Sequence, residues 1–301
     1  MGLAVILINW RHEERTLRCA RAVAGWHALK PHVIIVDNES TEATHRALSA
    51  AVPAENLICS TVNRGYAGGN NLGIERALAE ELEYVLLLNT DAEISADGVG
   101  RLLARLDAYT QIAIVGPVVN EADERQTRRL VGGRDIARHS FTRITMSPDD
   151  TEILPDYPVH AVEYVSGTVF LARSSVFKEI GLLDEEYFFS GEIADFCKRV
   201  REKGHKVCVD LEVEAQHHAG QMPIDRRETL YLYYGLRNRF LYVRKYYAER
   251  ELRYFAYWTM RGTLGFARAL LQWKIAKARA ILLAVIHGCR GRYGNQNAAF
   301  V

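Results

Sequence analysis

Three polar residues at alternate positions follow a short apolar run in the first third of the chain. Residues 84–88 read Tyr-Val-Leu-Leu-Leu, and Asn89, Asp91 and Glu93 come directly after them. The run is too short to span a membrane and suits a central strand that is covered on both faces. Carboxylates at the end of such a strand can hold a hard divalent cation through oxygen ligands and leave coordination positions for phosphate. Taken alone, the pattern also fits a strand that ends in an Asp/Asn turn.

Polar residues also follow three other expected strands. They are Asn9 and Trp10 after 3–8, Asp37 and Asn38 after 33–36, and Asn63 with the glycine-rich run 65–73 after 57–60. In an open α/β sheet, ligands bind outside the carboxyl ends of the strands. Glycines such as Gly65 and Gly68 let backbone N–H groups approach a diphosphate, and the next helix offers its positive N-terminus. Four clusters at one sheet edge therefore predict a site for a nucleoside diphosphate.

Two alternatives stay open at this point. The glycine-rich run lacks the G-x-G-x-x-G pattern of dinucleotide-binding folds. An Asp after the second strand, as at Asp37, does occur in those folds, so an NAD(P)-dependent oxidoreductase is one alternative. The other is a catalytically silent protein that binds a nucleotide sugar.

The spacing of apolar residues predicts alternating strands and helices. The expected strands are 3–8, 33–36, 57–60, 84–88, 112–115, 164–171, 206–209 and 213–218, and the clearest expected helices are 13–26, 96–108, 174–180 and 192–203. This order implies a mostly parallel sheet with right-handed crossovers, flanked by helices. Residues 120–160 are polar and weakly periodic, so we expect a loop or small excursion near the site.

Composition is that of an ordinary globular protein, with 49% hydrophobic and 25% charged residues in 301. The five cysteines form no C-x-x-C pair, which indicates a reducing compartment and argues against a cysteine-ligated zinc site. We read no signal peptide at the N-terminus. We therefore expect a cytoplasmic protein with no nucleic-acid partner.

Charge is distributed unevenly along the chain. No Asp or Glu occurs from Leu252 to Val301, and this region contains eight Lys and Arg, so its net charge is +8. Because the whole chain has a net charge of +1, residues 1–251 have a net charge of −7. The region 226–301 is also helical in pattern and rich in aromatic residues. Its longest late uncharged run has ten residues, about half of the ~20 that a spanning helix needs. Residues 251–292 therefore fit either an interfacial helix on the inner face of a membrane or a helical hairpin packed on the core or on a second copy, as in a homodimer.

Several of these segments, taken in order and spacing, resemble glycosyltransferase family 2, and most closely its rhamnosyltransferase-like members. The similar segments are Asn9-Trp10, 36–41, 63–73, 87–91, Ser166-Gly167, 181–188, 192–199, the strand that ends at His217, Tyr234 and Arg237-Asn238. The resemblance covers about residues 3–245. It implies a GT-A domain over about residues 1–225, followed by a helical extension over 226–301, and inverting transfer from a nucleotide-diphosphate sugar.

The resemblance also implies roles for single residues. Asp37 would contact the base of a UDP or dTDP donor, with Asn9 and Asn63 beside it, and Asn38 and Asn89 would also bind the donor. Asp91 and His217 would hold Mn²⁺ or Mg²⁺, which would neutralise the diphosphate leaving group. Ser166 and Gly167 would face the acceptor, a saccharide or a polyprenyl-linked saccharide.

The chain departs from the family at the position most often assigned as the catalytic base. The usual Glu-Asp pair reads Glu192-Ile193 here, so the Asp is missing. Inversion needs a carboxylate to take the proton of the acceptor hydroxyl. Glu192 and Asp195 lie on one helix face at i and i+3 and remain as candidates. Glu192 is the first choice, because Asp195 is also placed to pair with an arginine such as Arg199.

Overall fold

The computed structural model describes residues 2–122, 127–139, 152–154, 159–218 and 224–300. Its strands are β1 (Leu3–Asn9), β2 (His32–Asn38), β3 (Leu57–Ser60), β4 (Tyr84–Leu88), β5 (Ala92–Ile94), β6 (Ile112–Ala122), β7 (Thr127–Leu130), β8 (Glu152–Ile153), β9 (His160–Ala161), β10 (Val169–Arg173) and β11 (Lys206–His217). Its helices are α1 (Glu13–Ala24), α2 (Glu42–Ala51), α3 (Gly65–Ala79), α4 (Ala96–Ala108), α5 (Ser174–Ile180), α6 (Glu192–Glu202), α7 (Ile224–Tyr246), α8 (Glu251–Leu271) and α9 (Ile275–Arg290).

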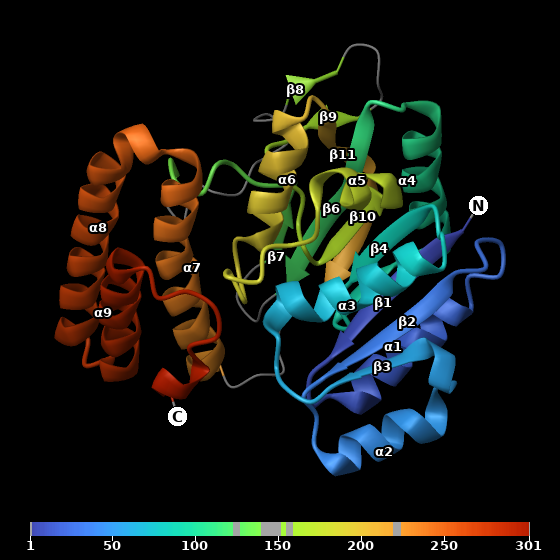
Figure 1. The fold of residues 1–301 in the computed structure, drawn as a ribbon, viewed down its shortest axis with the longest axis horizontal. Coiled ribbons are helices and arrows are strands. Elements are labelled where there is room, and N and C mark those ends of the chain that lie inside the picture. The colour runs from blue at the N-terminus through green and yellow to red at the C-terminus, as the bar shows by residue number, and fades with distance from the viewer. Residues whose placement is uncertain (1, 123–126, 140–151, 155–158, 219–223, 301) are drawn as a thin grey trace.

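One sheet organises the α/β part of the molecule (Figure 1). Its strand order among the described residues is β3-β2-β1-β4-β10-β6-β11-β9-β8, with β5 paired to β11 and β7 to β6. The strands β3, β2, β1 and β4 are parallel to one another, and β6 and β11 form a second parallel pair, whereas β10 runs antiparallel between β4 and β6. The expected mixed α/β sheet is therefore confirmed, and the carboxyl ends of its parallel strands share one edge.

Helices cover both faces of the sheet because each central strand is apolar on both sides. Ala4 and Ile6 of β1 face the layer of α3, α5 and α6, and Leu3, Val5 and Leu7 face that of α1 and α4. These residues are all at most 2% exposed. The alternation follows from the two-residue period of a strand, which sends successive side chains to opposite faces.

The glycine-rich run is not the loop that the sequence suggested. Helix α3 begins at Gly65 and includes the whole run, so its small residues are packing positions. A Cβ on Gly73 would lie 2.5 Å from Ile6 of β1, and Gly65 has a left-handed φ of +70° with the carbonyl oxygen of Phe188 in the place of its Cβ. The glycines therefore let α3 press against the sheet and against the segment before α6.

Two of the later strands differ from the expectation. The strand expected at 164–171 begins only at Val169, because Ser166–Thr168 form a turn in which Ser166 Oγ accepts a hydrogen bond from the Thr168 N–H. The strands expected at 206–209 and 213–218 are one strand, β11, with an irregular register between Asp210 and Glu214. The stretch 120–160, expected as a loop or small excursion, includes the end of β6 and the short strands β7, β8 and the start of β9. Residues 123–126, 140–151 and 155–158 lie outside the described residues.

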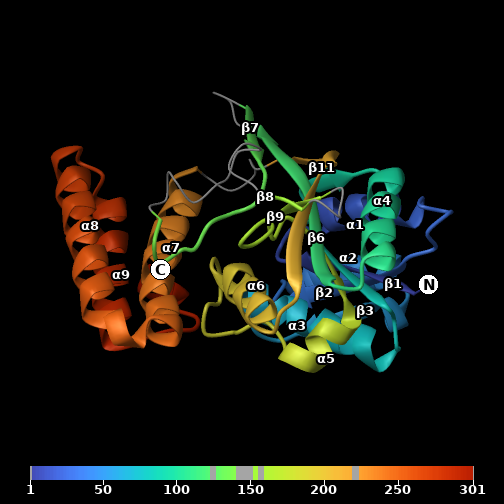
Figure 2. The same ribbon diagram turned by 90° about the horizontal axis from the view of Figure 1, so that it is seen from above.

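Helices α7, α8 and α9 pack side by side as a bundle at one side of the sheet (Figure 2). Their shared core includes Tyr233, Phe240 and Trp258, and it continues into Tyr187 and Ala194 of the α/β part. None of the described helices combines the length and the apolar character that crossing a bilayer would require. The C-terminal region is thus helical, as expected, and it rests on the segment that leads into α6.

Candidate active site

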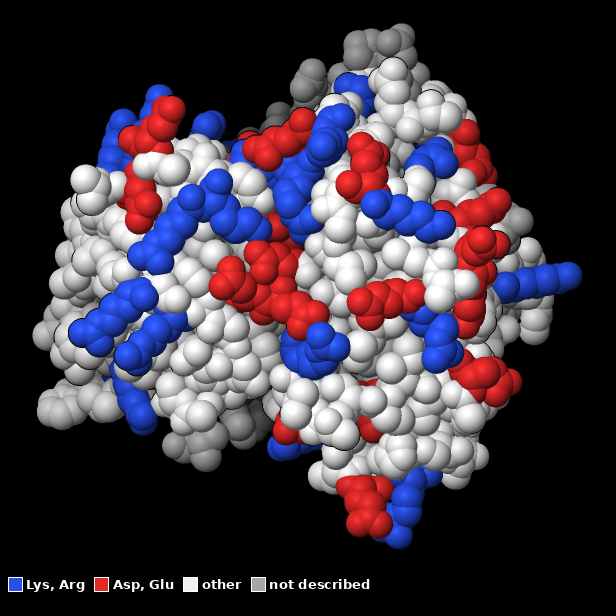
Figure 3. Space-filling view, viewed as in Figure 1, with Lys and Arg blue, Asp and Glu red and all other residues white. Residues whose placement is uncertain are grey.

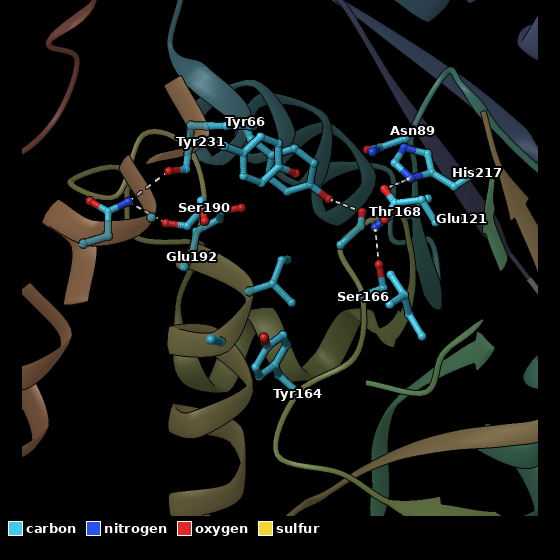
Figure 4. Close-up of a pocket in the computed structure, with 18 of the residues that line it drawn as sticks. Tyr66, Asn89, Glu121, Tyr164, Ser166, Thr168, Ser190, Glu192, His217 and Tyr231 are labelled. Carbon is cyan, nitrogen blue, oxygen red and sulfur yellow. Dashed lines mark hydrogen bonds and ion pairs between the residues drawn. The ribbon is translucent and has the colours of Figure 1, made fainter. Parts of the chain in front are cut away.

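A cavity of about 580 Å³ opens at the carboxyl edge of the sheet. Its wall includes Asp91 after β4, His217 at the end of β11, Glu192 at the start of α6 and Tyr231 from α7. In Figure 4, His217 and Asn89 lie on one side of this cavity, and Glu192 lies on the other. The site is thus built from the sheet edge, the α6 N-terminus and the first turns of the bundle.

The pairing of strands brings Asp91, His217 and Glu121 together. Ala92 of β5 stands opposite His217 of β11, and Glu121 of β6 is the partner of His217 on its other side. His217 Nε2 lies 3.4 Å from Asp91 Oδ1, and His217 Nδ1 lies 3.2 Å from Glu121 Oε1. Arg15 of α1 approaches the other oxygen of Asp91, at 3.5 Å. We call Asp91, His217 and Glu121 the metal side of the cavity.

Electrostatics on the metal side favour charged forms. Burial opposes ionisation of Asp91, but His217 and Arg15 outweigh it and lower the pKa of this carboxyl. Burial likewise opposes the charge of His217, but the hydrogen bonds to Asp91 and Glu121 raise the pKa of the imidazole to about 9. Each group is held by an opposite charge, which is the usual cause of such shifts.

The donor atoms of the metal side fit a divalent ion that displaces the proton from His217 Nε2 when it binds. The 3.4 Å between His217 Nε2 and Asp91 Oδ1 is a separation that two ligands of one ion at about 2.1 Å can have. Glu121 pairs with the other ring nitrogen of His217, which is the position of the carboxylate in a carboxylate–histidine–metal triad. Carboxylate and imidazole together suit Mn²⁺, and a carboxylate with phosphate oxygens suits Mg²⁺.

Glu192 is in the opposite situation. It is 6% exposed, and its Oε2 atom has no hydrogen-bond partner among the described residues. Burial, with a smaller contribution from the charge of Asp195, raises the pKa of Glu192 to about 7. A carboxylate whose pKa is near the working pH is suited to accept a proton from a substrate hydroxyl. We call Glu192 the base side of the cavity.

Asp195 does not line the cavity. It is fully buried and accepts hydrogen bonds from Tyr246 Oη at 2.7 Å and Arg199 Nε at 2.9 Å, and it pairs with Lys245. Its oxygens are thus occupied by structural partners, and the second candidate for the base is not supported by its position. Ile193, which stands where the family usually has Asp, is 5% exposed and packs in the core.

The bundle holds the segment that leads into Glu192. Asn238 of α7 donates hydrogen bonds to the carbonyls of Tyr187 at 3.0 Å and Phe189 at 2.9 Å, and also to that of Ser190. The same segment contains left-handed residues, among them Ser190 at φ 69° and Gly191 at φ 106°. Such backbone persists only where the surroundings enforce it, and it concentrates at functional sites. Asn238 therefore positions Glu192 at the cavity.

The residues expected around the nucleotide base form a network beside the cavity wall. Asn9 Nδ2 donates to Asp37 Oδ1 at 3.1 Å, because β1 and β2 place these two residues side by side. Asn38 accepts from the Arg64 N–H and donates to the Gly65 carbonyl, and Asn63 accepts from the Gly65 N–H. Asn9, Asn38 and Asn63 thus fix the strand ends and the start of α3.

Asp37 has two further neighbours that sequence reasoning did not single out. Its buried carboxylate lies 3.5 Å from His45 Nδ1, and the same nitrogen lies 3.5 Å from Cys59 Sγ. His45 and Cys59 are both exposed. A donor, an acceptor and a thiol are therefore grouped where the resemblance expects the nucleotide base.

The remaining expected site residues fall into two groups. Asn89, Ser166 and Gly167 line the cavity, and the Gly167 carbonyl accepts a hydrogen bond from Tyr66 Oη at 2.5 Å. Gly68 lies away from it, where a Cβ would meet Arg64 and the carboxylate of Glu185. The Gly65 N–H donates to Asn63 Oδ1 and the Gly68 N–H to the Arg64 carbonyl, so these contacts lend no support to the expected diphosphate role of the two glycines, which stays a prediction.

Sequence reasoning missed Glu121, Arg15 and the role of Asn238. The expected strand at 112–115 stopped before Gly116-Pro117, yet β6 continues to Ala122 and so carries Glu121 to the site. Arg15 lies in α1, and the sequence of this helix does not indicate which of its polar residues face the site. The resemblance did include Asn238, but only the structure shows what its amide binds.

A family model described as Glycosyl transferase family 2 matches residues 4–181, more than half of the chain. The chain belongs to glycosyltransferase family 2. The hexosyltransferase Agl10 of low-salt glycan biosynthesis from Haloferax volcanii is 26% identical to this glycosyltransferase in an alignment of 298 residues that covers 97% of this chain and 92% of Agl10. An N-acetylglucosaminyl-diphospho-decaprenol L-rhamnosyltransferase from Mycobacterium tuberculosis is 22% identical in an alignment of 285 residues that covers 85% of this chain and 88% of that protein. The relatives confirm the resemblance drawn from the sequence.

Among solved structures, the mannosyltransferase PcManGT from Pyrobaculum calidifontis, in complex with GDP-Man and Mn²⁺, has a TM-score of 0.61 to this glycosyltransferase. The match covers 96% of this chain and 87% of that chain at 14% identity. At this identity the likeness shows the fold. The expected GT-A fold with a helical C-terminal region is therefore confirmed.

Proposed function

We propose that this glycosyltransferase is metal-dependent and inverting, and that it moves a sugar from a UDP- or dTDP-sugar to a hydroxyl of a saccharide or lipid-linked saccharide. The observation that carries the proposal is the cavity whose two sides hold carboxylates in opposite states. One side groups Asp91 with His217, and the other holds Glu192 buried and without a partner for Oε2. These are the parts that a single in-line displacement requires.

Glu192 acts on the acceptor. Its carboxylate takes the proton of the acceptor hydroxyl as that oxygen bonds to the anomeric carbon from the face opposite the diphosphate. The bond between the anomeric carbon and the diphosphate oxygen breaks in the same step, and the nucleoside diphosphate leaves with the electron pair. Burial raises the pKa of Glu192 to about 7, so its carboxylate can take up this proton near neutral pH.

Asp91 and His217 act on the donor. Mn²⁺ or Mg²⁺ held by them would offset the negative charge of the departing diphosphate. Glu121 orients His217 through its other ring nitrogen, and Arg15 adds a positive charge beside Asp91. Asp37, which accepts a hydrogen bond from Asn9, would contact the base of the nucleotide.

A binding and transfer experiment tests the proposal. Thermal shift with UDP and dTDP, with and without Mn²⁺, should show stabilisation of about 2.7 kcal/mol at a hundredfold excess over Kd. Asp91→Ala should abolish the Mn²⁺-dependent part, and Glu185→Ala serves as the control because Glu185 pairs with Arg64 outside the cavity. Nucleotide binding without transfer from any sugar donor would instead support a catalytically silent binding protein, and bound NAD(P) would support the oxidoreductase.

The proposal also assigns different roles to two regions of the chain. Residues 1–225 would form the catalytic GT-A domain, and 226–301 the extension that supports it. We also infer that the basic extension brings the enzyme to the cytoplasmic face of an anionic membrane, where a polyprenyl-linked acceptor would reside. The decaprenol-linked acceptor in the name of the mycobacterial relative supports this choice of acceptor.

A further inference from the structure

The connection between α8 and α9 exposes four large apolar side chains. Their exposed fractions are 41% for Leu270, 84% for Leu271, 87% for Trp273 and 58% for Ile275. We call these four residues the hairpin tip. None of them belongs to the buried core that joins the helices of the bundle. The hairpin tip therefore contributes little to the packing of the described chain.

The turn holds Trp273 in an unusual conformation. The Lys274 N–H donates to the Ala269 carbonyl and the Trp273 N–H to the Leu270 carbonyl, which is the hydrogen-bond pattern of a Schellman helix end. The residue that takes the left-handed conformation in this pattern is usually glycine, but here it is Trp273 at φ 57°. A large indole is thus fixed outward in a backbone conformation that disfavours it, and folding alone gives no reason for it.

Positive charge surrounds the hairpin tip. Arg268 and Lys274 are exposed beside it, and no Asp or Glu follows Glu251 in the chain. On the left of Figure 3, acidic side chains of the bundle lie at its upper end, where α8 begins, and basic side chains extend below them. Apolar side chains with a basic border match the interface of a bilayer with anionic headgroups.

The hairpin tip lies at the end of the bundle where α7 begins, and Tyr231 of the cavity wall is seven residues, or about 10 Å, along α7 from that end. Helix α7 begins at that end and contributes Tyr231 and Asn238 to the cavity wall. Helix α8 runs back along α7 for 21 residues, or about 30 Å, so its last turn returns to the level at which α7 starts. Figure 1 shows the α8–α9 connection at this lower end of the bundle.

We propose that the hairpin tip inserts into the interfacial region of an anionic bilayer and holds the cavity close to the membrane surface. Trp273 and Leu271 enter the apolar boundary, while Arg268 and Lys274 contact the headgroups. The benefit for a lipid-linked acceptor rests on the function proposed above, but insertion itself does not depend on catalysis.

Flotation of the full-length protein with vesicles tests the proposal without any substrate. The probes are phosphatidylcholine vesicles with and without 30% phosphatidylglycerol as an anionic component. Trp273→Ala and Leu271→Ala should each lower partitioning onto the mixed vesicles by about tenfold, since each buries a large apolar side chain. The matched control is Leu252→Ala, because Leu252 is as exposed, at 87%, but lies at the other end of α8.

The outcomes separate this proposal from its competitors. Loss of binding in the two tip variants, with binding kept in Leu252→Ala, supports it. Equal binding of all variants, equal loss in Leu252→Ala, or no binding of the wild type to either vesicle would overturn it. The wild type could instead be a dimer by light scattering that does not bind vesicles. If Trp273→Ala then converts this dimer to a monomer, the hairpin tip contacts a second copy of the chain and not a bilayer. Transfer to a soluble acceptor is assayed separately, so failure of the proposed function has its own readout.

Discussion

The two sides of the cavity treat a carboxylate in opposite ways. On the metal side, Asp91 is surrounded by His217 and Arg15, and these charges lower its pKa. On the base side, Glu192 Oε2 has no hydrogen-bond partner among the described residues, and burial raises the pKa of Glu192 to about 7. Environments that separate the pKa values of two acids in one site are a mark of different catalytic roles. One carboxylate is prepared to stay ionised, and the other to gain and lose a proton.

The same contrast separates Glu192 from Asp195, three residues along one helix. Asp195 is more buried than Glu192, yet tyrosine, arginine and lysine partners compensate its charge. Burial alone therefore does not identify a catalytic acid. The distinguishing feature is burial next to a cavity without a compensating charge.

Glu192→Gln should have the largest effect on activity. Loss of the base is expected to lower kcat by about 10²- to 10⁴-fold, because the amide cannot accept the acceptor proton. The wild type should show a kcat that rises with pH through about 7, where Glu192 ionises, and levels off above it. Initial rates between pH 5.5 and 9 with saturating donor measure both effects. A variant that kept the wild-type rate and pH profile would remove Glu192 from the mechanism.

Asp195→Asn should instead lower stability by about 3 kcal/mol, because it leaves Arg199 and Lys245 without their shared carboxylate. Both cations are partly exposed, so water offsets some of the loss. Urea unfolding at pH 7.5 gives the free energy of unfolding, and rates at a temperature where the variant remains folded give its activity. A fall of kcat as large as that of Glu192→Gln, with unchanged stability, would exchange the roles of the two acids.

The structure of the metal side was predictable only in part. Asp91 and His217 could be predicted because each follows or ends an expected strand, and because both positions resemble the family pattern. Glu121 could not, because Gly116-Pro117 is a local signal to end a strand. Pro117 is tolerated since its partner on β11 is Asp210, where the register of β11 is irregular. Pairing between strands far apart in the sequence thus overrides the local signal.

The glycine-rich run shows the opposite limit of sequence reasoning. Glycine disfavours helix interiors, so the run 65–73 suggested a loop. Tertiary packing reverses this preference, because Gly73 must admit Ile6 and Gly65 must admit the Phe188 carbonyl. The bounds of α4 and α5, by contrast, match the expected helices 96–108 and 174–180, and in the structure Ser95 caps the first and Gly181 ends the second.

Glu121→Gln tests whether His217 binds the metal ion. Loss of the carboxylate that holds His217 Nδ1 should weaken Mn²⁺ binding by about 10- to 100-fold, which is typical for partners of a metal-ligating histidine. Isothermal titration of Mn²⁺ in the presence of UDP measures the affinity. Glu214→Gln is the matched control, since Glu214 lies on β11 and pairs with Arg129 outside the cavity. Unchanged Mn²⁺ affinity in Glu121→Gln would mean that His217 is not a ligand.

The smallest effect concerns stability on the base side, where Glu192→Gln should stabilise the protein that it inactivates. The folded-state pKa of Glu192, about 7, exceeds the usual value of 4.5, so the folded protein holds a proton that the unfolded chain releases between these pH values. The free energy of unfolding should therefore fall as pH rises from about 4.5 to 7. At pH 8 the variant should be more stable than the wild type by about 1–2 kcal/mol, because it replaces a buried charge with a neutral amide. The gain is limited because a buried amide without a hydrogen-bond partner is also unfavourable. Urea unfolding of both proteins at pH 5 and pH 8 tests this, and a variant less stable than the wild type at pH 8 would show that Glu192 is held by a compensating partner after all.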